Sequence, residues 1–302
     1  MTANAAHPAA TVVTPRRPKR RWGRYSLHVF LTTMAIVWLW PLVWAVYTSL
    51  RTFGDVQHNG YVSWPTALTI QNFIDAWVQA DLLRNYVQTI AIVVPAVIIT
   101  LLVASIVAYS VTRYSWKFNL LVLMIFTAGN LLPQQTIIVP LYHLYLALPL
   151  PGFLSDNGVM YNQLFGILFI NVVFQTGFCV FVLSNYMKTL SKELTEAALV
   201  DGAGVFRIWW SIILPLCRPA LAALATLEFT FIYNDFFWPL LLIKDGDRRP
   251  ITAALNNLQG QFFTNYNLLA AGAVMVAIPT IVVYIALQKH FVTGLTLGST
   301  KG

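Results

Sequence analysis

Long apolar runs without a lysine or arginine are the feature that most restricts how this chain can fold. A helix rises about 1.5 Å per residue, so roughly 20 apolar residues are needed to cross about 30 Å of hydrocarbon. Residues 118–187 contain no Lys or Arg, and this stretch is far longer than one crossing requires. The turn-rich sequence LPLPGFLSDNG, at residues 148–158, divides it into two. Six membrane-spanning helices are predicted, over residues 25–47, 86–111, 118–142, 161–186, 219–243 and 268–288.

The composition excludes an ordinary soluble domain. Of the 302 residues, 58% are hydrophobic and only 10% are charged, and the mean hydropathy is +0.66. Lipid offers the backbone no hydrogen-bond partner, so each span is expected to be helical. The predicted fold class is an all-α polytopic membrane protein.

The distribution of positive charge predicts the orientation. Six crossings place both termini on one side, and with the termini inside, 14 of the 19 Lys and Arg residues fall in inner segments. Both termini are therefore predicted to be cytoplasmic. The net charge of +8 then requires no nucleic acid, because the basic run PRRPKRR (residues 15–21) directly precedes the first span, where it orients the chain and attracts anionic membrane lipid.

Three regions are expected from this pattern. Residues 1–24 are predicted to be a disordered basic cytoplasmic tail, residues 25–290 a six-helix transmembrane domain, and residues 291–302 a cytoplasmic tail.

The chain lacks the residue patterns of the common enzyme and metal sites. It has no H-E-x-x-H, Cys-x-x-Cys or G-x-S-x-G, and its five histidines are scattered, so neither a catalytic nor a metal site is predicted. Cys179 and Cys217 are expected to be small apolar fillers. The sequence also has no G-x-x-x-x-G-K-[ST] phosphate loop, so work driven by a nucleotide would need the ATP site of a partner.

The inner segment 188–218 is longer than a simple connection between two helices needs. Ser191 is the predicted N-cap of a short helix, and either Gly202 or Gly204 can adopt the left-handed conformation that ends it. A second short helix is predicted from Val205 to Ile213, limited by Pro215. The residues alone leave two interpretations open: a knob that enters a cleft in another protein, or an amphipathic linker that rests on the bilayer.

This segment matches the signature E-A-A-x(3)-G-x(9)-I-x-L-P of importer-type ABC permeases. The matching residues are Glu196, Ala197, Ala198, Gly202, Ile212, Leu214 and Pro215. Residues 228–243 (EFTFIYNDFFWPLLLI) and 290–302 (HFVTGLTLGSTKG) resemble the carbohydrate-uptake branch of that family, similar to the six-span maltose-system permease. One departure is Ser191, where the family often has a proline shortly before the signature. The resemblance extends over nearly the whole chain after the basic tail.

The resemblance implies a type I ABC importer permease with a cytoplasmic helix-turn-helix coupling loop. In that family, the loop docks in a groove of an ATPase subunit. ATP and Mg bind to two such partner ATPases, and this chain itself is expected to bind no cofactor. The other implied partners are a second homologous permease and an extracytoplasmic substrate-binding protein, and the implied location is the bacterial inner or plasma membrane. The residues expected to take part in coupling are Glu196, Ala197, Ala198, Asp201, Gly202, Ala203 and Pro215.

Polar residues within the spans are candidates for a translocation path. Glu228 lies near mid-bilayer and Asp235 follows seven residues later, so both carboxylates are expected on one helix face, toward a wet cavity or a polar partner. Bonds between helices, or to the sister permease, are the alternative role. The full candidate set is Asn130, Gln134, Asn171, Gln175, Glu228, Tyr233, Asn234, Asp235 and Trp238.

The predicted function is the transport subunit of an ATP-driven importer for a sugar or oligosaccharide. Amide and carboxylate groups combined with aromatic faces are the chemistry that binds a neutral sugar. Two alternatives remain at this point: the same machine with another polyol or a phosphorylated polyol as cargo, and an integral membrane enzyme acting on lipid or glycan.

Overall fold

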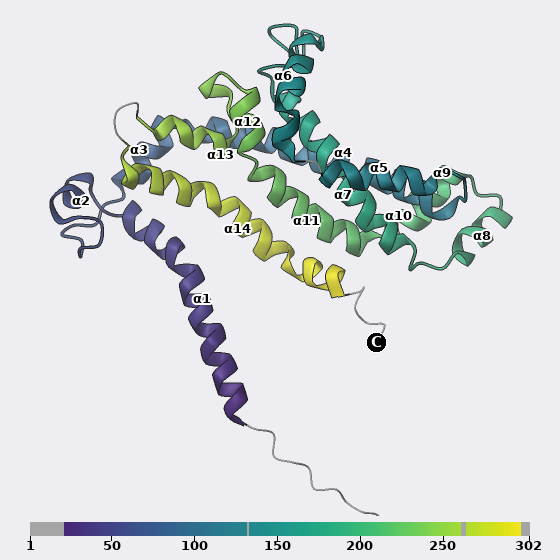
Figure 1. Ribbon diagram of the computed structural model, residues 1–302, viewed down its shortest axis with the longest axis horizontal. Coiled ribbons are helices and arrows are strands. Elements are labelled where there is room, and N and C mark those ends of the chain that lie inside the picture. Colours follow the sequence, from purple (N-terminus) through teal and green to yellow (C-terminus); the bar gives the residue numbers. More distant parts are fainter. Residues whose placement is uncertain (1–20, 132, 261–263, 297–302) are drawn as a thin grey trace, which may run out of the picture. The chain divides into compact units, whose positions relative to one another are not determined.

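The computed structural model describes residues 21–131, 133–260 and 264–296. Within these ranges there is no extended strand, and only two isolated bridges occur, Arg51 with Leu68 and Pro149 with Val159. The helical elements (Figure 1) are α1 (Arg21–Ser49), α2 (Phe53–Asn59), α3 (Gln71–Gln79), α4 (Leu82–Arg113), α5 (Asn119–Leu131), η1 (Gln134–Ile137), α6 (Ile138–Ala147), α7 (Leu164–Met187), α8 (Glu193–Val200), α9 (Val205–Ile208), η2 (Trp209–Ile213), α10 (Leu214–Leu216), α11 (Arg218–Tyr233), α12 (Phe237–Leu242), η3 (Gly246–Arg248), α13 (Ile251–Ala254), η4 (Leu255–Leu258) and α14 (Tyr266–Thr296). The all-α prediction is confirmed for the part of the chain that the structure describes.

The chain divides into two compact units, residues 1–44 and 45–302. Of the first unit, the structure describes residues 21–44, all of them in α1, where the rings of Trp40 and Trp44 lie 6.0 Å apart between centroids. Most of the predicted basic tail, residues 1–20, lies outside the described residues, whereas residues 21–24 are helical rather than disordered. The last residues of the predicted C-terminal tail, 297–302, also lie outside, and α14 continues through Thr296.

The second unit is built around α4, which packs along α7, and α11, which packs along both α14 and α4 (Figure 1). Buried residues recur along α4 at every third or fourth position, which places them on one face of the helix. They are mostly small, and small residues let helix backbones approach closely where no hydrophobic force acts between helices. The stripe consists of Asn85, Thr89, Ile92, Ala96, Thr100, Ala104, Ala108 and Val111.

The described residues contain four to six candidate spans. Four single helices are long and apolar enough to cross a membrane: 23–49, Leu82–Arg113, Leu164–Met187 and residues 266–288 of α14. Two bent pairs pass the same test together, 119–130 with 134–147, bent by 92°, and Val205–Leu216 with Arg218–Leu242, bent by 76°. Six crossings therefore remain a prediction, because they require each bent pair to count as one span.

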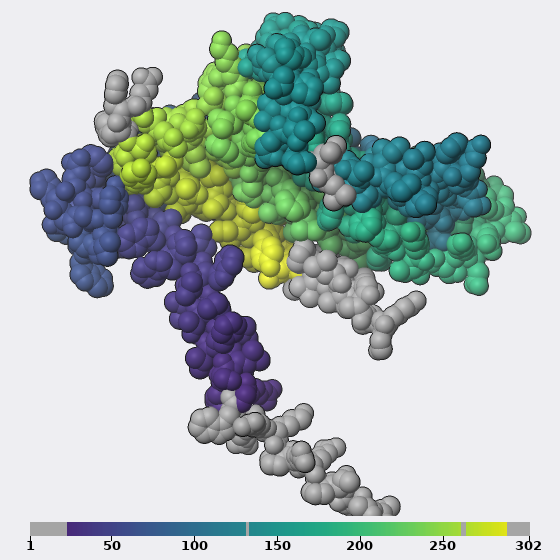
Figure 2. All heavy atoms as spheres, in the orientation of Figure 1, coloured from purple at the N-terminus to yellow at the C-terminus, as the bar shows by residue number. Residues whose placement is uncertain are grey.

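The third predicted span, residues 118–142, was expected to be one helix and is instead broken. α5 ends at Leu131, Pro133 has a non-helical ψ of 127°, and the chain resumes as η1 and α6. Proline cannot donate the hydrogen bond that would continue a helix, which accounts for the break. α6 then lies beside α12 (Figure 2), and a cavity of about 240 Å³ between them is lined by Tyr142, Trp238 and Leu242, among others.

The fifth predicted span is also interrupted, between Tyr233 and Phe237. Pro239 has no N–H for the carbonyl of Asp235, four residues earlier, and this carbonyl accepts a hydrogen bond from the Thr252 hydroxyl at 2.7 Å. The Asp235 carboxylate accepts the backbone N–H of Trp238 at 3.2 Å and so caps the new helix. The interruption therefore follows from Asp235 and Pro239 together with the Thr252 hydroxyl of α13.

Candidate coupling segment and membrane path

The segment 188–218 leads into α8, and Ser191 lies two residues before the start of that helix. The Ser191 hydroxyl accepts the backbone N–H of Glu193 at 3.1 Å, and Lys192 already has helical torsion angles. The N-cap is thus Lys192, whose carbonyl accepts the N–H of Glu196 at 3.1 Å, one residue after the predicted Ser191; the Ser191 hydroxyl instead bonds to the first residue of the helix.

Gly202 ends α8 in a left-handed conformation, with φ of +77°. Its N–H bonds to the Leu199 carbonyl at 3.0 Å, and the N–H of Ala203 bonds to the Ala198 carbonyl at 2.9 Å. This pair of bonds is the Schellman motif, which satisfies carbonyls left unpaired at a helix end. The sequence allowed either Gly202 or Gly204 to end the helix. Gly202 makes the turn, while Gly204 has φ of −69° and precedes α9.

The second helical run does not stop before Pro215, and this prediction is wrong. The run continues from α9 through η2 and α10 to Leu216. η2 is a π-helix in which the N–H of Leu214 bonds to the Trp209 carbonyl, five residues back. The wider π turn changes the register just before the proline, so that Pro215 lies inside the run and the chain bends only at Cys217.

The residues of the E-A-A signature divide between surface and core. Glu196 and Ala197 are exposed, whereas Ala198 is 7% exposed and lies in the apolar cluster that holds Ile208 and Trp209. The remaining predicted coupling residues follow the same division: Asp201 and Gly202 are exposed, while Ala203 and Pro215 are partly buried. One face of α8 is therefore available to a partner, and the other fixes α8 to the permease body.

Glu228 is fully buried, and it contacts α7 rather than an open cavity. One of its oxygens, Oε1, accepts the thiol of Cys179 at 3.2 Å, while Oε2 has no partner among the described residues. Cys179 and Cys217 are free and buried, as expected. The Cys179 thiol is nevertheless also a hydrogen-bond donor, a role that the sequence does not reveal.

Asp235 lies beyond the end of α11, so its spacing from Glu228 does not place the two on one helix. Its Oδ2 accepts the side-chain amide of Asn171, on α7, at 3.0 Å. Both carboxylates thus accept hydrogen bonds from α7. They do so from different elements, and not because a seven-residue spacing places them on one face of a helix. In this chain, Glu228 bonds to Cys179 and Asp235 bonds to Asn171, and both bonds connect to α7.

The remaining path candidates occupy different environments. Tyr233 is buried and donates its hydroxyl to the Val276 carbonyl of α14 at 2.9 Å. Asn130 lines a largely apolar cavity of about 420 Å³ between α5, α6 and α7, which offers little to bind a sugar. Asn234 is exposed, Gln134 and Gln175 are partly buried, and Trp238 is 2% exposed.

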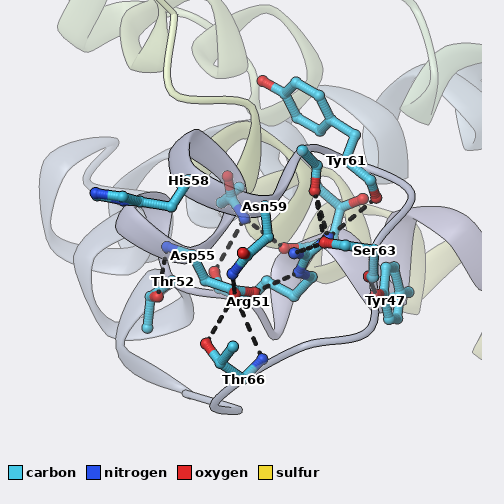
Figure 3. A network of polar contacts seen from close by, with 12 residues as sticks. Tyr47, Arg51, Thr52, Asp55, His58, Asn59, Tyr61, Ser63 and Thr66 are labelled. Carbon is cyan, nitrogen blue, oxygen red and sulfur yellow. Dashed lines mark hydrogen bonds and ion pairs between the residues drawn. The ribbon is translucent and has the colours of Figure 1, made fainter.

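A polar network around Arg51 lies just after α1, and sequence reasoning missed it (Figure 3). Arg51 Nε lies 2.7 Å from Asp55 Oδ2, and both side chains are 1% exposed. Arg51 also donates to the carbonyls of Gly60 and Tyr61, and Asp55 Oδ1 accepts from Thr66 Oγ1 at 2.7 Å. The Arg51 guanidinium, followed by the Thr66 hydroxyl, holds the pKa of Asp55 well below its usual range.

Comparison with known proteins identifies the family. The family described as binding-protein-dependent transport system inner membrane component matches residues 96–296. The chain belongs to this family. It is thus a permease, a multi-pass membrane subunit of a transporter, and the alternative of a membrane enzyme is wrong.

Individual relatives align over most of the permease. The melibiose/raffinose/stachyose import permease protein MelC of Bacillus subtilis is 30% identical over 263 residues, which cover 87% of this chain and 91% of MelC. The arabinooligosaccharides transport system permease protein AraQ of Halalkalibacterium halodurans is 31% identical over 285 residues, with 92% and 96% covered. The crystal structure of a bacterial ABC transporter involved in the import of the acidic polysaccharide alginate contains a chain with the same fold, at a TM-score of 0.74 and 21% identity, covering 92% of the permease and all of that chain.

Sequence reasoning also missed the hydrogen bonds that join α4 and α11 to α14. Pro279 removes the N–H that would bond to the Met275 carbonyl of α14, and this carbonyl accepts the Tyr86 hydroxyl of α4 at 2.7 Å. Tyr233 bonds to the adjacent Val276 carbonyl, so α4 and α11 both meet α14 at its proline. The proline was visible in the sequence, but its partners could come only from the packing of three helices.

Proposed function

We propose that the permease transports a sugar or oligosaccharide into a bacterial cell, as one of two permease subunits of an ATP-driven importer with both termini in the cytoplasm. The cargo class is supported by MelC and AraQ, whose names specify oligosaccharide transport and which align over nearly the full length of both chains. Transport of another polyol or a phosphorylated polyol would use the same machinery, so the cargo has to be tested directly.

In this proposal, α8 and the turn at Gly202 dock on a partner ATPase, which binds ATP and Mg²⁺. The observation that carries the proposal is the two-sided character of α8: Glu196 and Ala197 are exposed, while Ala198 is buried against the permease body. The exposed face also carries Leu199 and Val200, an apolar surface that a partner can cover, and the Schellman motif fixes the direction of the turn. Movement of the ATPases would then displace a rigid element that is continuous with the membrane helices.

The membrane path in this proposal lies between this permease and its homologous partner, and a substrate-binding protein delivers the cargo from outside. Direct sugar contact by Glu228 or Asp235 would require these carboxylates to leave their bonds to α7. We expect Asp235→Asn and Glu228→Gln to change transport through helix packing more than through recognition. An altered apparent affinity for the sugar at unchanged maximal uptake would contradict this expectation.

Complementation of a strain that lacks the permease tests both parts of the proposal. Uptake should be restored for radiolabelled oligosaccharides, and uptake of a polyol alone would replace the sugar interpretation. Glu196→Lys should abolish uptake and the co-purification of the ATPase while the protein still inserts. Lys117→Glu is the matched control, because it reverses an exposed charge on the same predicted side outside the coupling segment. Normal uptake and ATPase co-purification by Glu196→Lys would refute the coupling role.

A further inference from the structure

Arg113, the last residue of α4, bridges the connection between α7 and α8. Its Nη2 lies 3.1 Å from the carbonyl oxygen of Met187, the last residue of α7, and 3.3 Å from that of Leu190. Its Nη1 lies 3.2 Å from the Leu190 oxygen and 3.4 Å from that of Ser191, the residue before the N-cap of α8. One guanidinium thus bonds to the start, the middle and the end of the connection.

The chemistry of this contact favours arginine over other side chains. The last carbonyls of a helix have no partner within the helix, and a cation is favoured at that end. A guanidinium presents several donors in a fixed plane, whereas a lysine ammonium is a compact point charge on a flexible stem. Arg113 can therefore hold three carbonyls in a fixed relation to α4, which one ammonium can do only in part.

A second contact from α4 reaches the far side of the coupling segment. Tyr109, one turn before Arg113, is 3% exposed, and its hydroxyl lies 3.5 Å from the carbonyl oxygen of Val205, the first residue of α9. The buried residues Ala198 and Ile208 belong to the same apolar cluster as Tyr109. The end of α4 therefore contacts the segment both before α8 and after the Gly202 turn.

We propose that Arg113 is a positioning residue that makes α4 move together with α8. The inference rests on the proposed docking of α8 on an ATPase and adds the route by which its displacement enters the membrane domain. α4 packs along α7 and contacts α11. A push on α8 that is transferred to α4 thus reaches two further helices of the second unit at once, and without Arg113 the connection between α7 and α8 can yield instead.

The test compares Arg113→Gln and Arg113→Lys in the reconstituted transporter. For each variant, ATPase retention, basal ATP hydrolysis and cargo transported per ATP hydrolysed are measured. Arg113→Gln should retain the ATPase and its basal activity but transport roughly tenfold less cargo per ATP, within the usual range of coupling between sites. Arg113→Lys keeps the cation and should give an intermediate ratio. Lys117→Gln is the control, since Lys117 is exposed in the loop that follows α4, and it should give the wild-type ratio.

A wild-type ratio of cargo to ATP in Arg113→Gln would overturn the inference. If Arg113→Gln does not assemble, Arg113→Lys decides, and a wild-type ratio in that variant would overturn it equally. Failure of the underlying docking proposal is recognised separately: Glu196→Lys would then retain the ATPase, whatever the Arg113 variants do.

Discussion

Replacing Gly202 with alanine isolates the conformational requirement of the turn that ends α8, which is proposed to dock on an ATPase. A Cβ at Gly202 would meet no atom within 4 Å, so the substitution adds no steric contact. The φ of +77° is retained by the two Schellman bonds, and a residue with a Cβ adopts this region at a cost of roughly 1–2 kcal/mol. This corresponds to about a 5- to 30-fold lower population of the observed turn.

Gly204→Ala is the matched control for this prediction. Gly204 lies two residues away, a Cβ there also meets nothing within 4 Å, and its φ of −69° suits any residue. Both substitutions reduce the freedom of the unfolded chain equally, so that effect cancels in the comparison. Titrating the reconstituted permease with its ATPase should show weaker binding for Gly202→Ala than for Gly204→Ala, and Gly202→Asn should be intermediate because Asn tolerates the left-handed region. Equal affinities for the two alanine variants would show that the turn geometry does not control docking.

Three further predictions concern the stability of the permease. Gly177→Ala should cost roughly 1–3 kcal/mol, because its Cβ would overlap the Phe126 carbonyl and the Asn130 side chain of α5, whereas Gly129→Ala, inside α5, has open space and should not lower the melting temperature. Tyr233→Phe should cost about 1 kcal/mol by removing the bond to α14, while Tyr284→Phe, at a 52% exposed site, should not change the melting temperature. The pKa of Asp55 is lowered on folding, so its contribution is present above the ordinary value of 3.8 and is lost as the pH falls below it; Asp55→Asn should flatten the acid limb of a plot of melting temperature against pH.

The sequence was sufficient to place most membrane helices, because their signal is continuous over more than 20 residues. It failed where one or two residues change the local backbone. The interruption at Asp235 needs both a capping carboxylate and the Thr252 hydroxyl, which comes from a distant element. Pro215 can lie inside a helical run because of the π turn that begins at Trp209, and no spacing of apolar residues in the sequence predicts that turn.

The E-A-A signature was readable as a pattern, but its spacing does not separate exposed residues from residues that face the core. Ala197 and Ala198 are adjacent and identical in chemistry, yet the first is exposed and the second is buried. The difference follows from which face of α8 packs against Ile208 and Trp209, and this packing involves residues beyond the turn. Substitutions at Ala198 therefore report on folding, whereas those at Ala197 and Glu196 leave this packing intact and test the proposed docking.

Two prolines in the membrane helices, Pro239 and Pro279, affect which helices can move relative to one another. At Pro239 and Pro279, the carbonyl four residues earlier is left without its helical partner, and in both cases a hydroxyl from another element replaces it, Thr252 in the first and Tyr86 in the second. An unpaired carbonyl in lipid costs several kcal/mol, so these hydroxyls cannot separate from their partners without a replacement. Tyr86 and Tyr233 join α4 and α11 to α14 at neighbouring carbonyls. These three helices are therefore expected to move as one body.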